Sequence, residues 1–135
     1  MTTGLSYLWI AVGGALGSVA RFWLSGVVAN RFGETFPWGT LIVNVSGSFI
    51  IGVFAASTGP EGRWLVSPGF RQFFMIGICG GYTTFSSFSL QTLNLLRERE
   101  YFHAGGNVLL SVALCLVGVW LGHFVTMLIL GGKGT

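Results

Sequence analysis

Two stripes of polar side chains interrupt otherwise apolar sequence. In each, the residues stand four apart, so they would share one face of a helix. The stripes are Thr40, Asn44 and Ser48, and His103, Asn107 and Ser111. Amides and hydroxyls in such stripes either hydrogen-bond neighbouring helices or line an aqueous path. On its own, the first stripe is more typical of hydrogen bonding between helices.

Two aromatic residues form a third candidate site. Phe85 and Phe88 are three residues apart, which would place both rings on one helical face. The edge of a phenyl ring is electropositive, so the pair could contact a small anion without holding it tightly. Aromatic pairs at this spacing more often pack in a core or face lipid, and that alternative stays open.

The sequence just before these rings is the poorest helix former in its apolar segment. Gly80 and Gly81 each cost about 1 kcal/mol relative to alanine in a helix interior, and the β-branched Thr83 and Thr84 follow. We therefore expect a helix that breaks near residues 80–83 and resumes at Phe85. In hydrocarbon, a break is tolerated where its backbone groups are buried in protein, line a wet cavity or hold an ion. A glycine kink that serves packing is the simpler alternative.

The composition indicates that these elements lie in a membrane. Of 135 residues, 52% are hydrophobic and only 8% are charged, against roughly 25% charged in soluble domains. Four apolar segments reach the length of about 20 residues that a bilayer requires. They are residues 5–28, 38–57, 70–96 and 104–130. The sequence thus predicts an all-α membrane protein, with four transmembrane helices in a single domain over residues 1–135 and a break in the third helix.

Apart from Arg21, the basic residues divide evenly between the two sides. One side would carry Arg31, Arg97 and Arg99, and the other Arg63, Arg71 and Lys133. Because an excess of positive charge on one side orients a membrane protein, this tie predicts insertion both ways and an antiparallel, dual-topology homodimer. A chance tie is the alternative. The net charge of +3 is too thinly spread for a nucleic-acid surface.

The first span contains the one charge that lies well inside a predicted helix. Gly13, Gly17 and Arg21 follow one another at spacings of four. Small residues at that spacing allow close helix approach. An intramembrane arginine usually faces the protein interior or water, or else snorkels to the membrane surface.

The acidic residues argue against other functional classes. All of them (Glu34, Glu61, Glu98 and Glu100) fall in predicted loops. A proton-coupled drug exporter needs a carboxylate within the membrane. The sequence has no paired acids, no metal-ligand spacing and no nucleophile beside a base, so we expect no enzyme. A small dual-topology transporter and a structural membrane dimer without ion conduction remain alternatives.

Three motifs together resemble the Fluc (CrcB) family of fluoride ion channels. They are Gly13-Gly-Ala-Leu-Gly-Ser-Val-Ala-Arg21, Gly39-Thr-Leu-Ile-Val-Asn-Val-Ser-Gly-Ser-Phe-Ile-Ile-Gly52 and Gly80-Gly-Tyr-Thr-Thr-Phe-Ser-Ser-Phe88. The resemblance covers essentially the whole chain. It implies an antiparallel homodimer with two pores that passively exports fluoride through the bacterial or archaeal cytoplasmic (inner) membrane.

The resemblance also implies the pore residues. Phe85 and Phe88 match the family's paired pore phenylalanines, and Asn44 matches its pore-lining asparagine. Asn107 and Ser111 fall on the polar track of the last span. The matches of Asn107 and His103 are looser. Many members have serine at the position of Asn107 and tyrosine at the position of His103. Fluoride is strongly hydrated, and the donors that would replace its water are Asn44, Asn107, Ser111 and Thr84.

Three further expectations follow from the resemblance. The backbone carbonyls of Gly80 and Thr83 from each chain would hold a structural sodium ion at the dimer centre, since four oxygens suit a hard cation. Arg21 matches the arginine that closes the first motif, with a role in structure or in the vestibule. Gln91 stands where many members have glutamate, so no role for a carboxylate carries over. Its amide could still form hydrogen bonds at the pore mouth.

Overall fold

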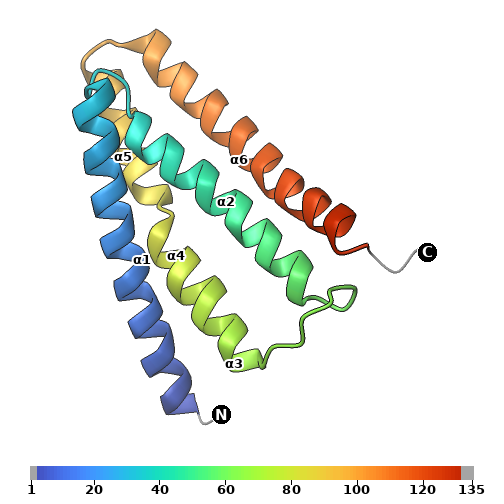
Figure 1. The fold of residues 1–135 in the computed structure, drawn as a ribbon. Coiled ribbons are helices and arrows are strands. Elements are labelled where there is room, and N and C mark those ends of the chain that lie inside the picture. The colour runs from blue at the N-terminus through green and yellow to red at the C-terminus, as the bar shows by residue number, and fades with distance from the viewer. Residues whose placement is uncertain (1–2, 132–135) are drawn as a thin grey trace.

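The computed structural model describes residues 3–131 as four long helical stretches (Figure 1). The first, second and fourth stretches are continuous helices, and the third is divided into four elements. They are α1 (Thr3–Phe32), α2 (Trp38–Thr58), α3 (Pro68–Arg71), η1 (Gln72–Cys79), α4 (Gly80–Tyr82), α5 (Phe85–Arg97) and α6 (Tyr101–Ile129). Each stretch is long and apolar enough to cross a membrane, which confirms the predicted all-helical, four-span architecture. No strand occurs within residues 3–131.

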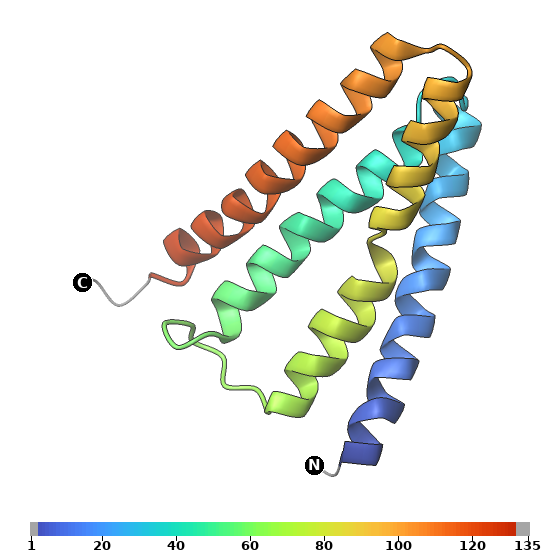
Figure 2. The ribbon, with the colours of Figure 1, turned by 180° about the vertical axis from the view of Figure 1, so that it is seen from behind.

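The four stretches run alternately up and down, so α1 begins and α6 ends at the same end of the molecule (Figures 1 and 2). They lie close together at the opposite end and splay apart toward this one. The helix bounds place Arg31, Arg97 and Arg99 at the converging end, and Arg63 and Arg71 at the splayed end. Lys133, which the even charge count includes, lies outside the described residues.

Helices that are not neighbours in sequence make the closest contacts. α1 packs on η1 and α4, and α2 packs on α6. Glycine makes both approaches possible. A Cβ on Gly17 would collide with the carbonyl oxygen of Ile78, and one on Gly122 with that of Phe49. The four-residue glycine spacing therefore serves close packing, which brings apolar helices together in lipid.

Two residues of extended backbone separate α4 from α5. Thr83 has φ −83° and ψ 157°, and Thr84 has φ −152° and ψ 111°. Gly80 and Gly81 keep helical backbone. The glycines therefore contribute to packing rather than to the extended conformation. At Gly81 a Cβ would come within 2.5 Å of the Gly14 carbonyl oxygen of α1.

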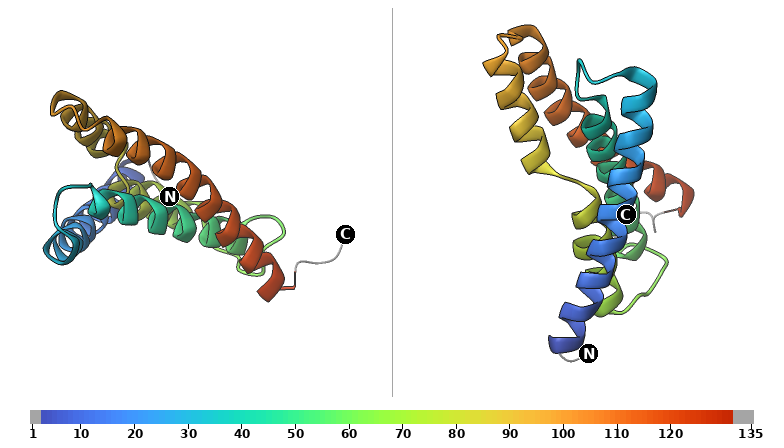
Figure 3. Two further views of the ribbon diagram at one scale, coloured as in Figure 1. Left: turned by 90° about the horizontal axis from the view of Figure 1, so that it is seen from above. Right: turned by 90° about the vertical axis from the view of Figure 1, so that its left-hand side faces the viewer.

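The extended residues move the chain from one packing partner to another. α4 lies against α1, whereas α5 lies against α6. The sideways displacement of α5 from α4 is visible in Figure 3 (right). We call Thr83 and Thr84 the link.

A tight turn joins α5 to α6 at the converging end. The Glu100 N–H donates to the Leu95 carbonyl at 2.8 Å, and the Arg99 N–H donates to the Leu96 carbonyl at 3.1 Å. This pairing is a Schellman motif, which places one residue in the left-handed conformation that glycine prefers. Here that residue is Arg99, with φ 62°.

Candidate functional site

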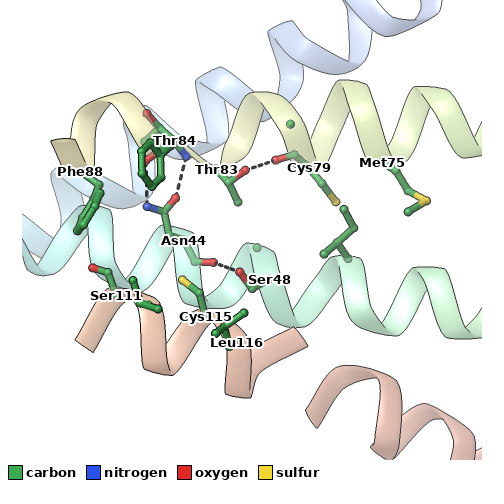
Figure 4. Close-up of a pocket in the computed structure, with 15 residues that line it drawn as sticks. Asn44, Ser48, Met75, Cys79, Thr83, Thr84, Phe88, Ser111, Cys115 and Leu116 are labelled. Atoms are coloured by element: carbon green, nitrogen blue, oxygen red, sulfur yellow. Dashed lines mark hydrogen bonds between the residues drawn. The ribbon is translucent and has the colours of Figure 1, made fainter. Parts of the chain in front are cut away.

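A cavity of about 430 Å³ lies beside the link and is partly open to the surface (Figure 4). α2, η1, α4, α5 and α6 all contribute to its walls. It brings together seven of the residues selected from the sequence: Asn44, Gly80, Thr83, Thr84, Phe85, Phe88 and Ser111. None of the described residues that line it is charged.

Asn44 holds the link against α2 through both ends of its side-chain amide. Its Nδ2 donates to the Thr84 carbonyl at 3.0 Å, and its Oδ1 accepts from the Thr84 N–H at 2.7 Å (Figure 4). Extended backbone loses its intrahelical partners, and an unpaired backbone group in hydrocarbon is strongly unfavourable. Asn44 therefore replaces the hydrogen bonds that the helix gives up at Thr84. Among residues 3–131, no acceptor takes the second Nδ2 hydrogen.

Thr84 also starts the next helix. Its Oγ1 accepts from the Ser87 N–H at 3.1 Å, which makes it the N-cap of α5. The backbone N–H groups of Phe85 and Ser86 in the first turn have no intrahelical acceptor, and the helix dipole adds partial positive charge there. Of these two residues, Phe85 lines the cavity.

The backbone carbonyls near the link differ in their partners. The Gly81 oxygen accepts from Arg21 Nε at 3.1 Å and from Ser18 Oγ at 3.5 Å. Of the groups that the structure describes, none donates to the carbonyl oxygen of Gly80 or of Thr83. Half-buried Arg21 thus fastens α1 to the link region, whereas two nearby carbonyl oxygens are left without donors.

The two phenylalanines that were predicted to act together lie at the cavity on α5. Their ring centroids are 5.4 Å apart, with 50° between the ring planes. Phe88 is buried at 8% exposure, whereas Phe85 is 78% exposed in the single chain. The two rings are tilted rather than stacked face to face, and both residues line the cavity.

Ser111 lines the cavity, and Asn107 lies behind Ser111, away from the cavity. Asn107 is 2% exposed and is not among the cavity-lining residues that the structure describes. Ser111 Oγ donates to Asn107 Oδ1 at 3.3 Å, and Asn107 Nδ2 donates to Thr92 Oγ1 at 3.0 Å. Sequence reasoning missed Thr92. The available signal was a hydroxyl four residues after Phe88 in the same helix.

A second cavity, of about 510 Å³, lies at the converging end of the molecule. Gln91 lines it together with Glu34, Glu98 and Glu100. Gln91 Oε1 is buried and accepts no hydrogen bond from any residue within 3–131. His103 pairs with Glu100 at 3.1 Å instead of facing the first cavity. Its stripe therefore divides, with Asn107 and Ser111 near the link and His103 at the helix start.

Comparison with known proteins decides the family. The profile of the family described as "CrcB-like protein, Camphor Resistance (CrcB)" matches residues 8–123. The chain belongs to the CrcB family. This confirms the resemblance drawn from the three sequence motifs.

Several CrcB relatives are similar to this chain over nearly their whole length. A protein of Opitutus terrae is 64% identical over 129 residues, which are 96% of this chain and 98% of the relative. Proteins of Rhodospirillum rubrum and Methylocella silvestris are each 59% identical, over 93% and 96% of this chain and 97% and 99% of their own lengths. All three are named "Fluoride-specific ion channel FluC". Membership of a family of ion channels confirms the expectation that the chain is not an enzyme.

Proposed function

We propose that this chain is a fluoride-specific channel that passively exports fluoride from the cytoplasm across the bacterial or archaeal inner membrane. The observation that carries the proposal is the uncharged cavity at the link, which is lined by residues with hydrogen-bond donors and by two phenylalanines. The names of the CrcB relatives support fluoride as the ion. A membrane potential, negative inside, would drive the anion outward with about 2.3 kcal/mol per charge per 100 mV.

Weak donors suit this task. Fluoride loses water on entering a narrow path, so the path must supply replacement donors. Asn44, Thr84 and Ser111, which carry amide and hydroxyl groups, line the cavity together with Phe85 and Phe88. Conduction requires contacts that are favourable enough for entry and weak enough for exit. A lysine or arginine would hold the anion more tightly.

The pathway requires a second copy of the chain, arranged antiparallel to the first. The described basic residues lie at both ends of the molecule, which is consistent with insertion in both orientations. The cavity is open along one side, and Phe85 beside it is 78% exposed. A partner would cover this side, and two-fold symmetry would give two equivalent pores.

A structural sodium ion at the dimer centre would fit the link. The Gly80 and Thr83 carbonyl oxygens lack described donors, and Gly80 is exposed on the single chain. Two copies would offer four such neutral oxygens, which is a donor set that suits a hard monovalent cation. When bound, the ion would supply positive charge that holds these carbonyls together. Replacing sodium with a large organic cation should then weaken the dimer in detergent, measured by its dissociation on dilution.

Fluoride efflux from liposomes that contain only this purified chain tests the channel proposal, with chloride efflux measured in parallel. Fast fluoride loss without chloride loss is expected. If well-folded, dimeric protein released neither ion, the proposal would fail, and the structural-dimer alternative would stand. Equal release of both ions would exclude a fluoride-specific path.

A further inference from the structure

Thr92 on α5 takes part in two hydrogen bonds, one with the Phe88 carbonyl and one with the Asn107 amide. Together they determine the direction of the hydrogen bond between Asn107 and Ser111. Thr92 Oγ1 donates to the Phe88 carbonyl at 2.8 Å and accepts from Asn107 Nδ2 at 3.0 Å. A threonine hydroxyl has one hydrogen and two lone pairs. Since the hydrogen is given to Phe88, only a lone pair can face Asn107.

This arrangement fixes the direction of the Asn107 amide. Asn107 is 2% exposed and is one of the two largest fully buried side chains among the described residues. A buried amide must find its partners within the protein. With Nδ2 directed at Thr92, Oδ1 is directed at Ser111 and accepts its hydroxyl hydrogen at 3.3 Å.

The Ser111 hydrogen therefore already has an acceptor within the protein. In the structure it points to Asn107 Oδ1, although the hydroxyl belongs to the cavity wall. An anion in the cavity would have to compete with Oδ1 for this hydrogen. Such competition weakens the contact and favours release, which is what a conducting site requires.

We propose that Thr92 is a positioning residue: by directing the Asn107 amide, it sets how tightly Ser111 holds a passing anion. This inference rests on the proposed fluoride channel. It assigns no anion contact to Thr92 itself, which does not line the cavity among the described residues.

Thr92→Val tests the inference because it keeps the branched shape and removes the hydroxyl. The Asn107 amide then loses the partner of its Nδ2. If the amide turned over, its Nδ2 could donate to Ser111. Its Oδ1 would then be unpaired, and proteins leave a buried carbonyl oxygen unpaired more readily than a buried N–H. The Ser111 hydrogen would then stay available to fluoride. The fluoride concentration for half-maximal efflux should fall by about two- to tenfold, the range of one net hydrogen bond, and the maximal rate should fall with it.

Two controls isolate the positioning effect. Thr92→Ser keeps the hydroxyl and should retain the wild-type concentration dependence. Thr126→Val removes a buried threonine hydroxyl of α6 that donates only to the Gly122 carbonyl, at 2.7 Å, and it should change neither parameter. Thr92→Ala makes the same deletion without valine's bulk, in case Thr92→Val does not yield a dimer.

The outcomes separate this inference from the channel proposal. Without fluoride efflux from the wild-type chain, the proposed function itself fails. With wild-type efflux, a Thr92→Val or Thr92→Ala channel that matches Thr126→Val in both parameters overturns the positioning role. The positioning role is also overturned if Thr92→Val and Thr92→Ser both lower the maximal rate and leave the half-saturating fluoride concentration unchanged, because that result indicates packing alone.

Discussion

Replacement of Asn44 by leucine should loosen the link and weaken the whole structure. Leucine has the same number of side-chain heavy atoms and the same branching as asparagine, and the substitution removes the two hydrogen bonds to the backbone of Thr84, at 3.0 and 2.7 Å. Thr84 has extended backbone, and its N–H and carbonyl would lose their only described partners. Both groups would remain in a part-buried, apolar setting.

The size of the effect follows from these two bonds. A net hydrogen bond contributes about 1 kcal/mol in soluble proteins, and bonds in a membrane bundle average about 0.6 kcal/mol. We therefore expect Asn44→Leu to lower the free energy of unfolding by about 1–3 kcal/mol. Ser57→Ala is the matched control, since this buried hydroxyl of α2 donates only to the Val53 carbonyl of its own helix, at 2.7 Å. That change should have a much smaller effect.

Unfolding by a denaturing detergent, followed by circular dichroism, measures both variants. Asn44→Asp adds a test of function on the same side chain. One carboxylate oxygen can still accept from the Thr84 N–H, but the other would face the Thr84 carbonyl oxygen, and the negative charge would repel an anion. Fluoride efflux should be abolished. An Asn44→Leu protein as stable as Ser57→Ala, together with full efflux through Asn44→Asp, would refute the role assigned to this residue.

Four other substitutions give separable results. Gly17→Ala should destabilise the fold by about 1–3 kcal/mol in the same unfolding assay, because its Cβ would collide with the Ile78 carbonyl. Gly14→Ala is the control and should not destabilise the fold, because nothing lies within 4 Å of its Cβ. Equal effects of the two substitutions would contradict the packing argument. Phe85→Ile and Phe88→Ile should each slow fluoride efflux by about tenfold while the dimer persists on gel filtration; full efflux in both would remove the rings from the pathway. Arg99→Gly should stabilise the chain by about 1 kcal/mol by relieving its left-handed backbone, and a loss of stability would instead indicate an arginine contact.

The sequence was sufficient to predict the helices because hydrocarbon leaves so few alternatives. Every backbone group in a span must be bonded internally, so apolar length alone predicts helix. Glycine spacing also pointed correctly to close packing, at Gly17 on α1. It did not indicate which helix would be the partner, since an apolar stripe is compatible with any neighbour.

The site was harder to predict, because the role of a polar group depends on what faces it. Asn44 was selected as an anion donor, but the sequence could not reveal that its amide also bonds the backbone of Thr84. Asn107 was selected for the same task, and its 2% exposure follows from the crossing of α5 and α6. Thr92 escaped notice because a hydroxyl in a helix most often bonds its own backbone. It does so here, and it also accepts from Asn107.

The pairing of α1 with the third stretch, and of α2 with α6, affects how the chain is made. The first closely packed pair must wait until residue 81 has been synthesised, and the second must wait until residue 122. At about 5–20 residues per second, α2 would stay without its partner in the membrane for several seconds. During that time the face of α2 that packs on α6, which includes Gly52, would be available to other helices. A chain truncated after α5 should therefore be degraded or captured, because it lacks the helix on which α2 packs.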